Sequence, residues 1–182
     1  MKSMDLAKSR LASALDSAGR HALARQMVDH VIDTLRQAGV GTVRVASGDQ
    51  GQGDLNADVT AAARLVESEG ATDLLLVMAD LPYLTVPDIA AMIAAGRKSP
   101  VVIAEAKDGG TNALLLRPPS VLKFSFATNQ PSAGLHGVEA RKAGIEPLFI
   151  SRPGLARDID TPADLEALIS DHPAYGVYRN VA

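Results

Sequence analysis

The sequence predicts an α/β protein in which a mainly parallel sheet lies between two layers of helices. Segments with helical spacing alternate with short apolar segments along the chain, as in parallel sheets joined by crossover helices. Residues 74–79 (LLLVMA) form an uninterrupted apolar run, which predicts a central strand buried on both faces. Apolar residues make up 47% of the chain but aromatic residues only 3%, so the core must be mainly aliphatic.

Composition bounds the class of protein. The chain has 182 residues and shows no internal repeat and no linker, so we expect a single domain over residues 1–182. The absence of cysteine excludes disulfides and thiolate sites. A net charge of -3 without a basic run argues against a nucleic-acid partner. No apolar run reaches the roughly 20 residues of a membrane span, and we expect a cytoplasmic protein with no membrane partner.

The first half of the chain predicts two helices and one strand before the apolar run. Residues 17–38 carry apolar side chains at helical spacing, and Gly39 is well placed to end that helix. Residues 42–46 (TVRVA) alternate as in a strand. A glycine-rich loop at 48–53 then leads to a second helix at 54–69.

Two capping signatures mark later helices. Thr85 with Asp88, and Thr161 with Asp164, each place a hydroxyl three residues before a carboxylate, the pattern of a capping box. They predict helices from Thr85 to about Arg97 and from Thr161 to about Ser170. The other expectations are strands at 101–105 and 113–116 around a turn at 107–111, an irregular stretch at 118–131, a helix at 132–143 and a strand at 147–150, with no assignment for the tail 172–182.

Three carboxylates are the strongest candidates for chemistry. Asp80 lies just past the apolar run, and ligands of open α/β sheets bind outside the carboxyl ends of strands. Asp158 and Asp160 alternate around Ile159, so both can face one cation if the segment is extended. Such oxygens suit Mg²⁺. Alternatively, Asp80 caps a turn and Asp160 belongs to the turn before Thr161.

Other polar groups are weaker candidates. The turn from Gly109 to Asn112 can admit an anion close to the backbone, but a plain hairpin turn also explains it. The cations Lys2, Lys8 and Arg10 precede the first long helix and can hold phosphates, or they form a solvated basic end. A single histidine, His136, is typical of a hydrogen-bonded core residue as well as of a site.

Taken together, these motifs resemble the guanylyltransferase family of coenzyme F420 biosynthesis, which acts on 2-phospho-L-lactate or phosphoenolpyruvate. Its relatives include the molybdenum-cofactor nucleotidyltransferases and the wider GT-A-like group, so the resemblance implies a GT-A-like nucleotidyltransferase fold. The matching stretches, in family order over almost the whole chain, are residues 2–11 (KSMDLAKSRL), 54–57 (DLNA), 79–82 (ADLP), 109–116 (GGTNALLL), 132–136 (SAGLH) and 158–165 (DIDTPADL).

The resemblance also implies an activity and a set of roles. The phosphate of a small phosphorylated acid would attack the α-phosphorus of GTP and release pyrophosphate, with Mg²⁺ as cofactor. The implied roles are catalysis by Asp80, Asp158 and Lys8, metal binding by Asp80, Asp158 and Asp160, nucleotide binding by Lys2, Lys8, Arg10 and Asn56, and binding of the acid by Thr111, Asn112 and Ser132.

The chain departs from the family pattern at two places. Relatives usually have an apolar strand just before the lysine that Lys2 matches, and Met1 stands here where a valine is common. We therefore expect a sheet that lacks a strand beside the nucleotide, with reduced stability or unusual pairing at that edge. Relatives also carry a Phe-Gly pair before the serine, whereas residues 126–132 are longer and lack that glycine. Phosphoenolpyruvate, 2-phospho-L-lactate and 3-phosphoglycerate all remain candidate acids.

Two alternatives are compatible with the residues. One is a related nucleotidyltransferase of the molybdenum-cofactor type, although those proteins normally carry a glycine-rich loop where this chain has Lys8 and Arg10. The other is an inactive nucleotide-binding domain, against which the retained Asp80, Asp158 and Asp160 argue. If the chain forms an oligomer, we expect a two-fold symmetric homodimer, the commonest arrangement.

Overall fold

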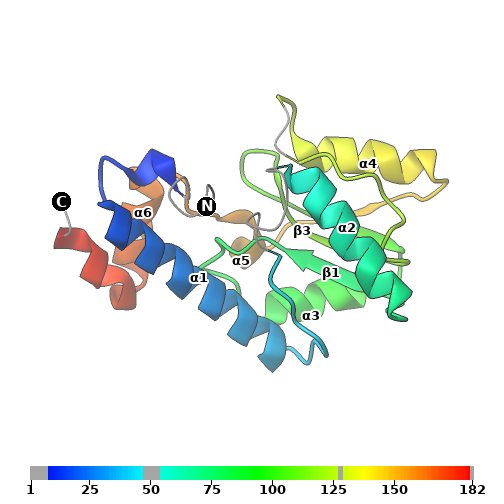
Figure 1. The fold of residues 1–182 in the computed structure, drawn as a ribbon, viewed down its shortest axis with the longest axis horizontal. Coiled ribbons are helices and arrows are strands. Elements are labelled where there is room, and N and C mark those ends of the chain that lie inside the picture. The colour runs from blue at the N-terminus through cyan, green and yellow to red at the C-terminus, as the bar shows by residue number, and fades with distance from the viewer. Residues whose placement is uncertain (1–7, 47–53, 127–128, 181–182) are drawn as a thin grey trace.

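The computed structural model describes residues 8–46, 54–126 and 129–180. Strands and helices alternate through most of this range (Figure 1). In chain order the elements are η1 (Ser9–Leu11), α1 (Ser17–Gln37), α2 (Leu55–Ser68), β1 (Leu74–Val77), α3 (Val86–Ala95), β2 (Val101–Glu105), β3 (Thr111–Leu116), α4 (Ser132–Lys142), β4 (Leu148–Ile150), α5 (Pro153–Ala156), α6 (Pro162–Asp171) and η2 (Pro173–Asn180).

The four strands form one mixed sheet in the order β1-β3-β2-β4. Strand β3 is antiparallel to both β1 and β2, and β4 is parallel to β2. Three strands therefore run in one direction and β3 runs against them. The predicted α/β class is confirmed. The tight turn between β2 and β3 explains the reversal, because a short turn can join only antiparallel neighbours.

Helices cover both faces of the sheet (Figure 1). One core cluster joins α1 and α3 to the sheet and includes Val31, Ile89 and Val102. The second cluster joins α2 and α4 to the opposite face and includes Val59 and Ile103. Successive residues of a strand point to opposite faces, so Val102 and Ile103 belong to different clusters. This is the predicted three-layer arrangement.

A third apolar cluster lies beyond the sheet, where α1 begins and the chain ends (Figure 1). It joins Leu11 and Leu23 to Leu168 of α6 and to Tyr175 and Tyr178 of η2. Among the described residues, η1, the short α5 and η2 were not predicted. Each is a single turn or a 3₁₀ segment, and such pieces carry too few apolar repeats to be recognised from periodicity.

The predicted helix starts are confirmed by local hydrogen bonds. Helix α2 starts after Asp54, whose carboxylate accepts the backbone N–H of Asn56 at 2.9 Å. The Asp88 carboxylate accepts the backbone N–H of Thr85 at 3.1 Å before α3. The Asp164 carboxylate accepts that of Thr161 at 2.8 Å before α6. Capping is local chemistry, which explains why the sequence predicts it well.

The predicted strand at residues 42–46 is wrong, because the structure has no strand there. Val45 is 59% exposed, and among the described residues no strand pairs with this segment. Strand propensity becomes a strand only where a neighbour supplies hydrogen bonds. The glycine-rich loop expected at 48–53 lies outside the described residues.

Strand β1 differs from its expected position in the sheet. Leu75 packs against one core cluster and Leu76 against the other, but all four residues of β1 are only partly buried, whereas the sequence predicted burial on both faces. Within the described residues, however, β1 pairs only with β3 and forms an edge of the sheet. An apolar run indicates that both faces of a strand contact the core, but it does not indicate whether the strand is central or at the edge of the sheet. The expectation of a strand missing beside this edge stays a prediction, since Lys2 and its neighbours lie outside the described residues.

Candidate functional site

Three carboxylates converge at the end of the sheet where β1 stops. Asp80 follows β1, and Asp158 and Asp160 lie between α5 and α6. The backbone N–H of Ile159 donates to the carbonyl oxygen of Asp80 at 3.3 Å, which joins the two segments directly. The Ile159 side chain is 1% exposed and packs in the third cluster, so the aspartates on either side of it turn outward, as predicted.

The three carboxylates are close enough to share one cation. One oxygen from each of Asp80, Asp158 and Asp160 lies within 4.8 Å of the others, and all three residues are partly buried. Burial raises the pKa of Asp158, and the charges of Asp80, Asp160 and Asp108 raise it further. A site that makes a carboxylate harder to ionise in this way favours a bound cation.

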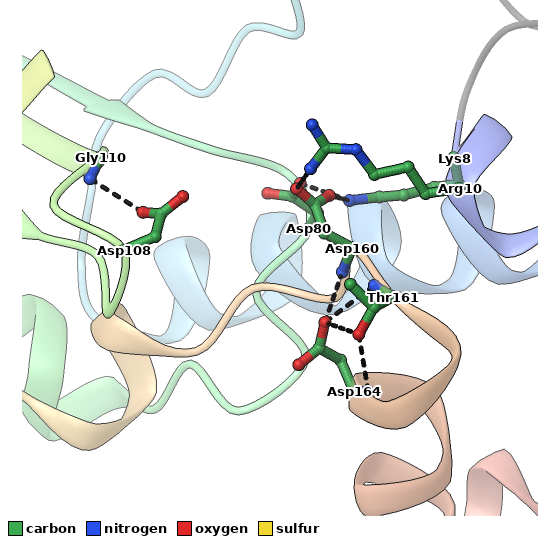
Figure 2. A network of polar contacts seen from close by, with 8 residues as sticks. All are labelled: Lys8, Arg10, Asp80, Asp108, Gly110, Asp160, Thr161 and Asp164. Atoms are coloured by element: carbon green, nitrogen blue, oxygen red, sulfur yellow. Dashed lines mark hydrogen bonds and ion pairs between the residues drawn. The ribbon is translucent and has the colours of Figure 1, made fainter. Parts of the chain in front are cut away.

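Lys8 supplies a positive charge at this cluster (Figure 2). Its Nζ donates to Asp80 Oδ2 at 2.6 Å and to Asp160 Oδ1 at 2.8 Å. Burial acts to lower the pKa of Lys8, but the two carboxylates outweigh it and the pKa is raised. The side chain is only 11% exposed, so its charge is matched here rather than by water.

The backbone of Lys8 has a φ of +57°. A non-glycine residue pays about 1–2 kcal/mol for this left-handed conformation, and such strain often marks functional positions. Arg10 adds a second cation, with Nη1 at 3.3 Å from Asp160 Oδ2. Its side chain is 73% exposed, so it can reorient toward a ligand at little cost.

Helix α6 holds Asp160 in place through its first turn (Figure 2). The Asp164 carboxylate accepts the backbone N–H of Asp160 at 3.2 Å as well as that of Thr161. The backbone of Asp160 therefore belongs to the turn before Thr161, as one of the two interpretations proposed. Its side chain nevertheless faces the acidic cluster, so both interpretations describe part of the same residue.

The turn between β2 and β3 lies at the same end of the sheet as the three carboxylates. The Asp108 carboxylate accepts the backbone N–H of Gly110 at 2.8 Å (Figure 2). Gly109 has a φ of +84°, and a Cβ there would meet Pro131 at 3.0 Å. The backbone N–H of Met78 donates to the Asn112 carbonyl at 2.8 Å. The start of β3 therefore lies beside the end of β1, two residues before Asp80.

A buried polar triad lies at the start of β3 and in the first turn and a half of α4. Ser132 Oγ donates to Thr111 Oγ1 at 3.0 Å, and Nδ1 of His136 lies 2.9 Å from the same oxygen. The His136 side chain is fully buried, and burial lowers the pKa of His136 to about 4. Its imidazole is therefore neutral at physiological pH.

The side chains of two predicted binding residues, Asn112 and Asn56, form hydrogen bonds with backbone groups of the protein. The side-chain amide of Asn112 donates to the Leu155 carbonyl at 2.9 Å and ties β3 to α5. The Asn56 side chain donates to the Phe126 carbonyl at 3.1 Å and accepts the Phe126 N–H at 2.6 Å. Asn112 therefore links β3 to α5, and Asn56 links α2 to the segment that contains Phe126.

The structure thus brings together most of the predicted site. Lys8, Arg10, Asp80, Asp158 and Asp160 form one cluster, and Thr111 with Ser132 forms a second group at the same edge. Lys2 lies outside the described residues, and Asn56 joins neither group through the contacts above.

Sequence reasoning treated His136 only as a weak candidate without a role, and it did not consider Asp108. A signal for His136 was present, because it follows Ser132 by four residues in a predicted helix, and such residues share a face. No comparable signal marked Asp108.

Comparison with known proteins identifies the family of this chain. Residues 1–175 match the family described as "Guanylyl transferase CofC like". The chain is 37% identical to the phosphoenolpyruvate guanylyltransferase of Rubrobacter xylanophilus, over 92% of this chain and 90% of that protein. It is 36% identical to the phosphoenolpyruvate guanylyltransferase of Chloroflexus aurantiacus, over 88% and 87%. It is 34% identical to the 2-phospho-L-lactate guanylyltransferase of Methanothrix thermoacetophila, over 87% and 76%.

A solved structure supports the fold. A nucleotide-diphospho-sugar transferase-like protein from Desulfovibrio desulfuricans superposes with a TM-score of 0.71 at 18% identity, over 96% of this chain and 91% of that one. At this identity the likeness concerns the fold alone, and it confirms the GT-A-like architecture. No helix in the described ranges is long and apolar enough to cross a membrane. With the family match over nearly its whole length, this chain belongs to the CofC-like guanylyl transferases.

Proposed function

We propose that this protein transfers a guanylyl group from GTP to phosphoenolpyruvate and releases pyrophosphate, with Mg²⁺ as cofactor. The observation that carries the proposal is the convergence of Asp80, Asp158 and Asp160 beside Lys8 and Arg10, at the carboxyl end of β1. Both the cation and the charged phosphates of the substrates require such a site. We also propose a cytoplasmic location, where GTP is available as a substrate.

The reaction exchanges one P–O bond for another. An oxygen of the acid's phosphate forms a bond to the α-phosphorus of GTP, while the bond between the α-phosphorus and the bridging oxygen to the β-phosphate breaks. Pyrophosphate takes both bonding electrons, and the product carries the acid on a guanosine diphosphate. No covalent enzyme intermediate is needed, so positioning and charge stabilisation are the protein's main tasks.

The residues fit a magnesium site. Carboxylate oxygens are the ligands that Mg²⁺ prefers, and it usually keeps several waters beside one or two carboxylates and substrate phosphates. Asp80, Asp158 and Asp160 would hold it. When bound, the metal neutralises charge on the phosphates and orients them for displacement.

The basic residues have a separate task. Lys8 and Arg10 are the cations beside the cluster, and each can bind phosphate oxygens of GTP by charge-assisted hydrogen bonds. Thr111 and Ser132 present hydroxyls from β3 and α4, which suit an oxyanion of the acid. The choice of phosphoenolpyruvate follows the relatives at 37% and 36% identity, whose names carry this acid. The relative at 34% is named for 2-phospho-L-lactate.

The test is pyrophosphate release by the purified protein with Mg²⁺. GTP, CTP, ATP and UTP are each paired with phosphoenolpyruvate, 2-phospho-L-lactate and 3-phosphoglycerate. We expect the highest kcat/KM for GTP with phosphoenolpyruvate and no release when EDTA removes the metal. A preference for another acid would correct the acceptor and keep the reaction. Silence in all twelve pairs would refute the proposed activity of this chain.

A further inference from the structure

The polar triad of Thr111, Ser132 and His136 includes a histidine to which no role has been assigned so far. His136 is fully buried and uses both ring nitrogens. Its Nδ1 lies 2.9 Å from Thr111 Oγ1, and its Nε2 lies 3.0 Å from the backbone nitrogen of Ser125. A histidine with a purely structural role could also make two such hydrogen bonds. The directions of the hydrogen bonds therefore decide which role His136 has.

The contact with Ser125 fixes the tautomer of the ring. A backbone N–H can only donate, so Nε2 must carry a lone pair. The ring is neutral, and its single proton therefore sits on Nδ1. Nδ1–H then donates to Thr111 Oγ1. The opposite direction, from Thr111 to Nδ1, would require a proton on Nε2 that faces the proton of Ser125.

In this arrangement the hydroxyl groups of Thr111 and Ser132 together retain one proton that can be donated to a ligand. Thr111 Oγ1 accepts from Nδ1–H of His136 and from the hydroxyl of Ser132, which fills its two acceptor sites. Within the described ranges no protein acceptor takes the hydroxyl proton of Thr111. Reversing the bond between the two hydroxyls moves the spare proton to Ser132 but does not remove it. The pair therefore presents one O–H donor.

The ring is held tightly in this orientation. The ring centroid of Phe126 lies 4.7 Å and that of Phe124 lies 6.4 Å from the centroid of His136, both in edge contact. Phe126 is itself fastened to α2 by its two backbone hydrogen bonds with Asn56. The segment from Phe124 to Phe126 thus fixes the ring from two sides and supplies the N–H that sets its tautomer.

We propose that His136 is a positioning residue for the phosphorylated acid. Its Nδ1–H occupies Thr111 Oγ1 as an acceptor, so the Thr111–Ser132 pair turns a hydroxyl proton toward an oxyanion of the substrate. The inference rests on the proposed function, because that function gives the triad its ligand. It explains why a neutral histidine is buried here: the charged ring would donate from Nε2 as well and lose the bond from Ser125.

Two substitutions separate the two ring nitrogens. In His136→Asn the side-chain amide can take the place of Nδ1–H and keep a donor to Thr111. In His136→Gln the amide reaches instead toward the position of Nε2. We expect His136→Gln to raise the KM for the acid about tenfold, the worth of one hydrogen bond, with the KM for GTP unchanged. His136→Asn restores the KM for the acid to within about threefold of the original. His30→Gln, a matched change at a partly buried histidine of α1, alters neither.

A double-mutant cycle tests whether His136 acts through Thr111. In a Thr111→Val background, His136→Gln should add no further rise in the KM for the acid. Additive effects overturn the inference, and so does an equal rise in both KM values. ¹⁵N NMR of the unmodified protein at pH 7 gives a readout apart from activity: Nδ1 of His136 must carry the proton, and a proton on Nε2 refutes the positioning role. An inactive unmodified protein instead overturns the proposed function and, with it, the assigned ligand.

Discussion

The ammonium nitrogen of Lys8 lies 2.6 Å from Oδ2 of Asp80, although 72 positions separate the two residues. It also lies 2.8 Å from Asp160. The side chain of Lys8 thus provides the positive charge that a metal ion would provide to the same carboxylates. The proposed metal would compete with Lys8 for the same oxygens, and we expect Lys8 to turn toward the phosphates of GTP when that metal binds.

Replacing Lys8 by methionine should strengthen the response of the fold to Mg²⁺. Without the ammonium the three carboxylates repel one another, so the free protein is less stable, and a cation relieves more repulsion than before. We expect a larger rise in Tm on adding MgCl₂ than for the unmodified protein, together with a loss of turnover. Thermal unfolding at increasing MgCl₂ measures this. Arg10→Met is the matched control, since Arg10 is more exposed and its one ion pair among the described residues is with Asp160; its effect should be smaller. An identical Tm response in Lys8→Met would contradict the competition.

Asp80→Asn should abolish turnover while leaving the fold intact. The side chain of Asp80 is 30% exposed and contributes little packing, whereas a lost metal ligand removes several kcal/mol of charge stabilisation, about 100-fold or more in rate. Asp73→Asn is the control, because Asp73 precedes β1 at its other end and pairs with Arg117. Pyrophosphate release and thermal unfolding are compared for both. Near-normal turnover in Asp80→Asn would exclude the metal assignment.

The buried His136 should make the protein less stable in mild acid. Its pKa is about 4 in the folded chain and about 6.5 when unfolded, so the unfolded chain takes up the proton first. The free energy of unfolding therefore falls as the pH drops from about 6.5 to 4 and is insensitive to this group above 7. Urea denaturation at several pH values, for the unmodified protein and His136→Gln, isolates the contribution. Parallel curves for the two proteins would show that the ring titrates normally.

Asn56 should matter for stability through its two bonds to Phe126. Asn56→Ala leaves the buried N–H and carbonyl of Phe126 without these partners, at about 1–3 kcal/mol. Asn56→Asp keeps an acceptor for the Phe126 N–H and should cost less. Chemical denaturation measures both variants. If alanine and aspartate cost the same, the hydrogen bonds are not what stabilises the segment from Phe124 to Phe126.

The parts of the fold that the sequence predicts depend on local chemistry. Helix starts at Asp54, Thr85 and Thr161 follow from side chains that bond to the backbone within three residues. The outward pair Asp158 and Asp160 follows from the alternation of an extended segment. The strand expected at 42–46 failed because pairing depends on a partner elsewhere in the chain, and no periodicity within five residues contains that information.

The sequence predicted the carboxylates of the site, but it did not predict the contacts that other residues of the site make. The sequence pointed to Asp80 because ligands bind at strand ends in this fold class, and to Asp158 because it alternates with Asp160 around Ile159. The contact of Lys8 with Asp160 spans 152 positions, so it is decided by tertiary packing alone. The same is true of His136 and Thr111, which are 25 positions apart and meet only when α4 packs beside β3.

The C-terminal 3₁₀ segment η2 affects the position of Asp160 through a series of contacts. Tyr175 and Tyr178 pack on α6 in the third cluster, and the Tyr178 hydroxyl donates to Gln26 of α1 at 2.8 Å. Helix α6 in turn fixes the backbone of Asp160 through Asp164. The η2 segment therefore supports, from a distance, the position of a proposed metal ligand, and we expect its shortening to weaken cation affinity without altering any group proposed to touch the substrate.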